Sequence, residues 1–94
     1  MQIGCHNEFT IFGRILYGNK KVRVNNHNAI ELCILCPNDD DYSKEPNRVY
    51  VNVITNDSKM FKYMKGRVIG ITGHIITQYG QKLIADVISF PNAI

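Results

Sequence analysis

Residues 48–66 read RVYVNVITNDSKMFKYMKG, and this stretch decides the fold. In its first eight residues, valines alternate with polar or aromatic residues, so the valines share one face of a strand while Arg48 and Tyr50 share the other. The remainder opens with capping residues, continues with Met and Phe at helical spacing, and ends at Gly66, a residue suited to terminate a helix. The stretch therefore predicts a strand and then a short amphipathic helix over 56–66.

Strand character also precedes and follows this stretch. The other segments with alternating β-branched or aromatic residues are 8–17, 20–36 with an interruption at 25–28, 67–79 and 82–90. Gly13 indicates a bend within the first of them, and Gly18-Asn19 predicts a turn after it. Three strands, a short helix and two strands follow one another in the order of the OB fold. We therefore expect an all-β, five-stranded OB-fold barrel with the short helix between strands 3 and 4, in one domain over residues 1–94.

Charge is unevenly distributed along the chain. The net charge is +3, yet the segment 37–47, which predicts a long solvated loop, holds four carboxylates against one lysine. The rest of the chain is therefore distinctly basic, which favours contact with phosphate. An odd number of cysteines argues against a secreted disulfide framework. No apolar run approaches the roughly 20 residues of a membrane span, and the N-terminus lacks a signal-peptide pattern. We therefore expect a cytoplasmic protein that does not contact a membrane.

Several stretches resemble, in the same order, the bacterial family of single-stranded DNA-binding proteins. They are NEFTIFGRI at 7–15, NRVYV at 47–51, YMKG at 63–66 with the segment 68–73 after it, and TQY at 77–79. The resemblance implies an OB fold, binding of single-stranded DNA with little sequence preference in replication, recombination or repair, no catalysis, and assembly into a homodimer or homotetramer. The chain has no tryptophan and no acidic tail after Phe90, whereas that family uses such a tail to recruit replication and repair enzymes. A tailless chain of this length is also similar to the primosomal replication protein N family.

Binding of single strands needs cations along the backbone path and aromatic faces for unpaired bases. Tyr50 shares a strand face with Arg48, Tyr17 ends the first strand before a basic run, and Tyr79 stands at a hairpin tip. The residues expected to bind nucleic acid are Arg14, Tyr17, Lys20, Lys21, Arg23, Arg48, Tyr50, Tyr79 and Lys82. Three lysines of the expected helix are assigned to its solvated outer face: Lys59, Lys62 and Lys65.

Metal binding and catalysis have little support in the sequence. Cys33 and Cys36 have the CxxC spacing, and Cys5-His6 could supply two further ligands. However, an odd offset on a strand sends the two thiols to opposite faces, and no second ligand pair follows. No histidine has a carboxylate partner at useful spacing, and no glycine-rich phosphate loop is present. We therefore expect buried structural thiols, no metal, no cofactor and no enzymatic activity.

The sequence thus predicts a non-enzymatic protein that coats single-stranded DNA by phosphate contacts and base stacking. Two alternatives stay open. One is a primosomal-type adaptor that contacts replication proteins and binds DNA only secondarily. The other is an OB module that binds RNA.

Overall fold

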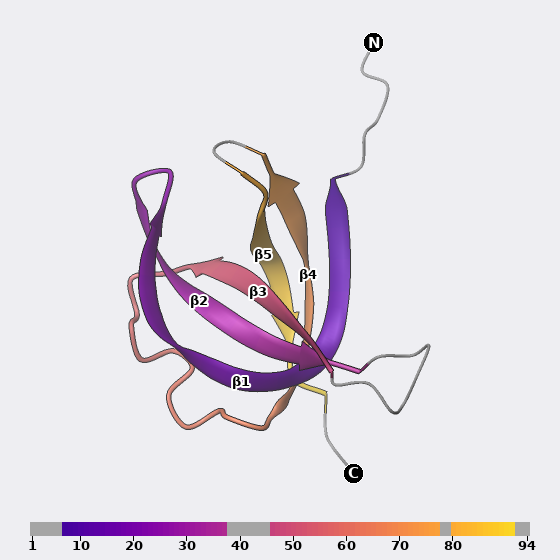
Figure 1. Ribbon diagram of the computed structural model, residues 1–94. Helices are drawn as coiled ribbons and strands as arrows, with labels where there is room; N and C mark the ends of the chain where they lie inside the picture. The colour runs from indigo at the N-terminus through magenta and orange to yellow at the C-terminus, as the bar shows by residue number, and fades with distance from the viewer. Residues whose placement is uncertain (1–6, 38–45, 78–79, 92–94) are drawn as a thin grey trace.

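Five strands close into a barrel in the computed structural model, which describes residues 7–37, 46–77 and 80–91 (Figure 1). The strands are β1 (Glu8–Val24), β2 (His27–Cys36), β3 (Asn47–Ile54), β4 (Val68–Ile76) and β5 (Lys82–Ser89). They are arranged in the order β1-β2-β3-β5-β4, with β4 returning to β1. All neighbouring pairs are antiparallel except β3 and β5, which are parallel. The all-β, five-stranded OB-fold prediction is confirmed.

The long strand β1 joins the two halves of the barrel. Its first half pairs with β4 and its second half with β2, and Arg14 faces a partner on both sides, Val68 and Leu35. Gly13 makes this crossover possible, because a Cβ at this position would lie only 2.3 Å from the carbonyl oxygen of Leu35. The bend that Gly13 indicated in the sequence is therefore a close backbone approach.

The predicted turn at Gly18-Asn19 is wrong, since β1 continues through both residues to Val24. The chain reverses instead at Asn25 and Asn26, whose φ angles are 48° and 67°. Positive φ at both central residues is the requirement of a type I′ turn, whose twist matches that of the two flanking strands. Asparagine tolerates this conformation. Gly18 serves packing, because a Cβ there would lie 2.6 Å from the Leu32 side chain.

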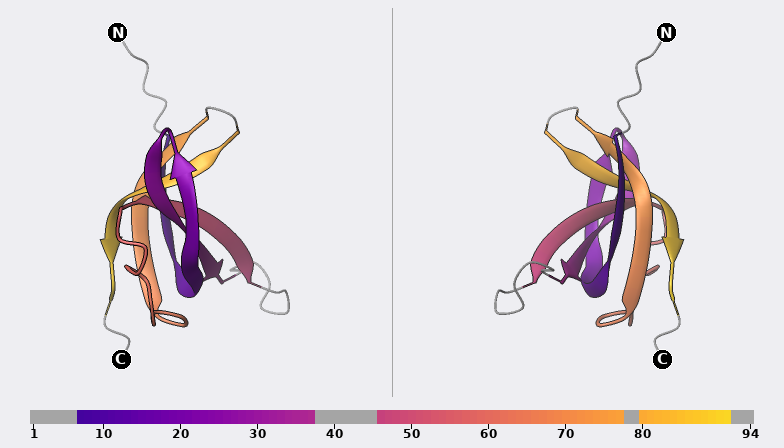
Figure 2. Two further views of the ribbon diagram at one scale, coloured as in Figure 1. Left: turned by 90° about the vertical axis from the view of Figure 1, so that its left-hand side faces the viewer. Right: turned by 90° about the vertical axis from the view of Figure 1, so that its right-hand side faces the viewer.

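The predicted helix over 56–66 is also wrong. This segment forms a succession of turns, in which amides bond to carbonyls three residues earlier; one such bond joins the Met64 amide to the Phe61 carbonyl at 3.2 Å. Tyr63 has a φ of 67°, which a right-handed helix does not allow. We call residues 55–67 the turn segment. It runs along the side of the barrel to the end opposite the β1–β2 hairpin, as the views of Figures 1 and 2 show.

The core fills the inside of the barrel with aliphatic side chains from four strands and one aromatic ring from the turn segment. Its buried members are Ile15, Ile30, Leu32, Ile34, Val51, Val53, Phe61, Ile69 and Ile71. The alternation of the strands places every second residue of β2 in this core, which leaves the residues between them on the outer face. Within the described residues, no helix is long and apolar enough to cross a membrane.

Candidate nucleic-acid interface

The outer face of β1, β2 and β3 collects five of the nine residues that the sequence assigned to nucleic-acid binding. Strand register places three rows across it, namely Arg14–Leu35–Arg48, Tyr17–Cys33–Tyr50 and Lys20–Glu31–Asn52. The central residues of the rows are alternate residues of β2, so all three rows lie on one side of the sheet. Two irregularities in β1, on either side of Tyr17, keep its side chains in these rows. We call this surface the tyrosine face.

Tyr17 and Tyr50 stand on either side of Cys33. The Cys33 side chain has no exposed surface, whereas Tyr50 is 46% exposed and Tyr17 is half-buried. Because neighbouring strands are about 4.8 Å apart, the two tyrosines project from strands separated by roughly 10 Å. The row therefore offers two aromatic rings with a small buried thiol between them.

Glu31 contacts both Tyr17 and Lys20 on the tyrosine face. The Tyr17 hydroxyl donates a hydrogen bond to its Oε1 at 3.4 Å, and Lys20 Nζ lies 3.7 Å from the same oxygen. Partial burial, together with the charges of Cys33, Glu31 and Tyr50, raises the pKa of Tyr17 to about 12. Tyr17 is therefore a neutral, hydrogen-bonded ring at physiological pH.

This environment predicts that Tyr17 ionises at higher pH than an ordinary tyrosine. Since its pKa is raised in the fold from 10.0 to about 12, the protonated phenol stabilises the folded state fully below pH 10 and loses that effect as the pH rises through 12. An ultraviolet titration of tyrosinate should show a late step that is absent from Tyr17→Phe. If Tyr17→Phe removed an early step instead, the shift of the Tyr17 pKa would be disproved.

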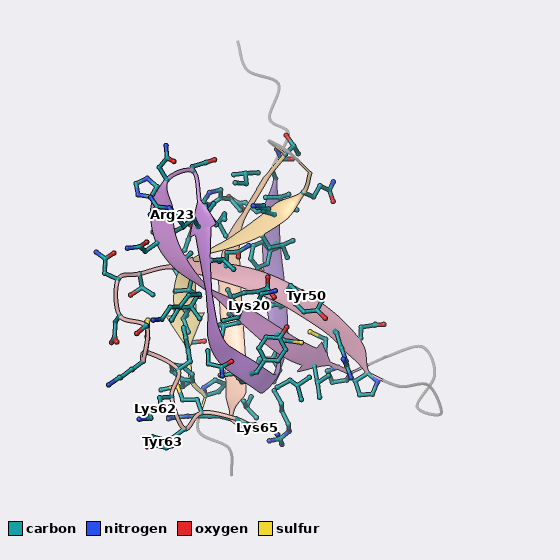
Figure 3. The ribbon with its side chains drawn as sticks, turned by 60° about the vertical axis from the view of Figure 1, so that its left-hand side comes forward. Lys20, Arg23, Tyr50, Lys62, Tyr63 and Lys65 are labelled. Carbon is teal, nitrogen blue, oxygen red and sulfur yellow. The ribbon has the colours of Figure 1, made fainter. Side chains whose placement is uncertain are left out.

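The remaining predicted residues lie away from the tyrosine face or outside the described residues. Arg23 is exposed beside the β1–β2 hairpin, where its guanidinium donates to the Asn26 carbonyl at 2.8 Å. Lys21 turns to the other side of β1 and lines a cavity of about 220 Å³. Lys82 begins β5 opposite Ile76 of β4. Tyr79 falls outside the described residues. Figure 3 shows Tyr50 and Lys20 over the middle of the sheet, with Arg23 above them near the hairpin.

His74 corrects one sequence expectation. Its Nδ1 lies 2.9 Å from Asp86 Oδ2, although no carboxylate partner was expected for any histidine. The pairing arises because an irregularity between Thr72 and Gly73 shifts the register of β4 against β5 and brings Asp86 beside His74. A partner created by register between strands has no signature in local spacing.

The two described cysteines are free thiols. Cys33 belongs to the outer tyrosine row, whereas Cys36 packs against the inner core, so they lie on opposite sides of the sheet as their spacing indicated. Burial raises the pKa of the Cys36 thiol. In the part of the chain that the structure describes, no three His, Cys, Asp or Glu side chains are grouped to hold a metal ion. Cys5-His6 lies outside the described residues.

One exposed aromatic residue with basic neighbours, Tyr63, is not among the residues predicted from the sequence to bind nucleic acid. Tyr63 is 90% exposed, and Lys62 Nζ lies 4.9 Å from the centroid of its ring. The predicted helix over 56–66 placed the lysines on a solvated surface and gave Tyr63 no role. The signal in the sequence is the interleaving of Tyr63 with Lys62 and Lys65, the same combination of tyrosine and cations that predicts binding at the tyrosines of the strands.

Neither a protein-family model nor a curated protein sequence matches this chain. Solved structures do. The dimeric N-terminal domain of PriB protein from Thermoanaerobacter tencongensis is 14% identical, over 93% of this chain and 98% of that domain, with a TM-score of 0.67. The mitochondrial single-stranded DNA-binding protein Rim1 of S. cerevisiae is 18% identical over 88% of this chain and 92% of its own, with a TM-score of 0.68.

A third similar structure is a deletion mutant of the single-stranded DNA-binding protein of Thermus aquaticus. It is 11% identical over 94% of this chain and 42% of that chain, with a TM-score of 0.68. The chain has the OB fold of these proteins. At such identities the similarity establishes the OB fold alone.

Proposed function

We propose that this protein binds single-stranded DNA with little sequence preference, through the tyrosine face, in replication, recombination or repair. The observation that carries the proposal is the row Tyr17–Cys33–Tyr50, with Arg14 and Arg48 in the row on one side and Lys20 on the other. The OB fold binds oligonucleotides on the face of its strands 2 and 3. Tyr50 and Arg48 lie on this face of β3.

The chemistry of the tyrosine face suits unpaired bases. An aromatic ring stacks on any base, at about 1–3 kcal/mol per base, and needs a base whose flat face is free. A duplex hides those faces within its own stack. Since stacking does not read hydrogen-bonding edges, two rings without a dense set of donors and acceptors favour binding that tolerates any sequence.

Cations on both sides of the tyrosine row suit the phosphate backbone of a strand of DNA that runs along the row. Arg14 and Arg48 are exposed at one end, and Lys20 is exposed toward the hairpin. With three phosphate contacts on a single strand, the affinity for oligo-dT should fall by roughly 20-fold between about 50 and 200 mM salt. Equilibrium titrations at several salt concentrations measure this slope. Failure to bind oligo-dT at low salt would overturn the proposal.

The second candidate is the primosomal-type adaptor left open by the sequence. The likeness to the PriB domain, which spans 98% of that domain, supports it. In that case the main task of the protein would be to contact replication proteins, with weaker DNA binding. A pull-down with a replicative helicase, compared with the measured affinity for bare DNA, separates the two roles. Competition between DNA and RNA oligomers of equal length tests the RNA-binding alternative in the same assay.

We also propose that the protein assembles into a homodimer or homotetramer through the outer face of β1, β4 and β5. Phe12 is 59% exposed and lies over Gly70, and Val87, one row away beside Thr72, is 64% exposed. Apolar side chains so placed are typical of a surface that another protein covers. Light scattering of the free protein, run beside the oligo-dT titration, gives the number of subunits and of strands bound.

A further inference from the structure

Tyr63 has an unusual position in the turn segment. Its φ of 67° is a conformation that costs a residue with a Cβ about 1–2 kcal/mol, and its ring is 90% exposed. The segment on both sides is nevertheless fixed. The buried Phe61 anchors it to the core, and Gly66 donates its amide to the Ile15 carbonyl at 2.7 Å. A ring held out into solvent from a well-anchored segment, at a strained residue, points to a binding role.

The surroundings of Tyr63 are basic. The turn segment carries four cations, Lys59, Lys62, Lys65 and Arg67, against the single carboxylate of Asp57. Among the described residues, no carboxylate lies within ion-pair distance of any of the four. Lys62 Nζ sits over the Tyr63 ring at 4.9 Å, so a strongly hydrated cation covers one face of the ring and the other face is free. The charge favours a polyanion over an apolar partner.

The turn segment adjoins the tyrosine face. A cavity of about 230 Å³ connects them, with Tyr17 and Asn19 on the β1 side and Tyr63 and Lys65 on the other. Arg14 also ties the two surfaces together, because its guanidinium donates to the Gly66 carbonyl at 2.9 Å. Figure 3 shows Lys62, Tyr63 and Lys65 at the lower end of the surface that carries Tyr50 and Lys20.

We propose that Tyr63 is a third base-stacking platform, which extends the path of single-stranded DNA from Tyr17 onto the turn segment, with Lys62 and Lys65 contacting the flanking phosphates. The inference rests on the proposed function of the tyrosine face and adds a site to it. A strand that is stacked on Tyr50 and Tyr17 leaves the sheet at the cavity and places its next unpaired base on the free face of Tyr63. Short oligomers that fill the tyrosine face alone do not reach this platform.

The test compares variants over a ladder of oligo-dT lengths, from about 4 to 16 nucleotides. In Tyr63→Gly the ring is lost, the charge is unchanged, and the backbone keeps its conformation because glycine accepts a positive φ. We expect its affinity to equal that of the unmodified protein for the shortest oligomers that bind, and to be about 5- to 150-fold lower for the longest. Tyr63→Phe keeps the stacking face and should bind like the unmodified protein at all lengths.

Met60→Ala is the matched control, since Met60 is 40% exposed in the same segment but has no aromatic ring; its affinity should not change. An unchanged affinity of Tyr63→Gly at every length would overturn the inference, and so would an equal loss at every length. Failure of the unmodified protein to bind any oligomer would instead refute the proposed function itself. Circular dichroism establishes that each variant is folded.

Fluorescence supplies a readout that affinity does not. The protein has no tryptophan, so its intrinsic emission comes from five tyrosines. The difference between the unmodified protein and Tyr63→Phe isolates the emission of Tyr63. We expect long oligo-dT to quench this emission and short oligo-dT to leave it unchanged. Absence of quenching with the longest oligomer would also overturn the inference.

Discussion

Replacing both Tyr17 and Tyr50 with alanine should weaken the binding of oligo-dT by about 30- to 25,000-fold, because two stacked bases contribute roughly 2–6 kcal/mol together. Both rings lie in one row of the tyrosine face, and neither belongs to the barrel core. The loss should therefore come from binding and leave the fold intact. Anisotropy of a labelled oligomer at one fixed salt concentration measures it, since affinities at different salt are not comparable.

The matched control is the double variant Tyr17→Phe and Tyr50→Phe. It keeps both aromatic faces and removes both hydroxyls, including the hydrogen bond from Tyr17 to Glu31. If stacking carries the binding, the phenylalanine pair binds nearly as well as the tyrosine pair. A loss in the phenylalanine variant as large as that in the alanine variant would show that the hydroxyls, and not the rings, hold the strand.

Phe61→Ala should have the largest effect on stability, with a loss of about 3–5 kcal/mol in the free energy of unfolding. Phe61 is 3% exposed and is the residue through which the turn segment enters the core. It packs so closely on β1 that a Cβ at Gly18 would lie 2.8 Å from its own Cβ. A loss of this size is a large part of the roughly 5–15 kcal/mol that stabilises an ordinary domain.

Urea unfolding followed by circular dichroism measures this loss as a shift in the midpoint at constant slope. Met60→Ala, at the neighbouring exposed position, should change the free energy of unfolding by no more than about 0.5 kcal/mol. If the two variants unfolded alike, the assignment of Phe61 as the anchor of the turn segment would be wrong.

Strands β3 and β5 could be predicted closely because alternation within each segment marks its buried face, whereas residues 20–24 were predicted with the second strand and belong to β1. The prediction for β3 began and ended one residue after the observed strand, and β5 ended one residue earlier than predicted. The turn segment could not be predicted in this way. Its Met and Phe spacing fits a helix, but a helix this short is marginal without tertiary packing. In the structure the segment forms successive turns, which bury Phe61 in the core without a helix.

The first hairpin shows a similar limit. Gly18-Asn19 and Asn25-Asn26 both carry residues that favour turns, and what decides between them is the packing of Leu32 and Phe61 against Gly18, which involves residues distant in the sequence. For the candidate site, the pairing of Arg48 with Tyr50 followed from alternation within one strand. The approach of Tyr17 to Tyr50 depends on two irregularities in β1 and on the register of three strands. Their proximity could therefore not be predicted from the sequence pattern.

Cys33 has a consequence for how the tyrosine face is built. The spacing of the strands fixes the separation of the Tyr17 and Tyr50 rings. The size of the side chain between them influences how closely the rings lie against the sheet. A thiol is small enough to vanish completely beneath its neighbours. A bulkier side chain at this position would tilt the rings outward and change the angle at which a base could lie on them. The small size of Cys33 thus helps to set the orientation of the two tyrosine rings, although Cys33 itself would not contact the base.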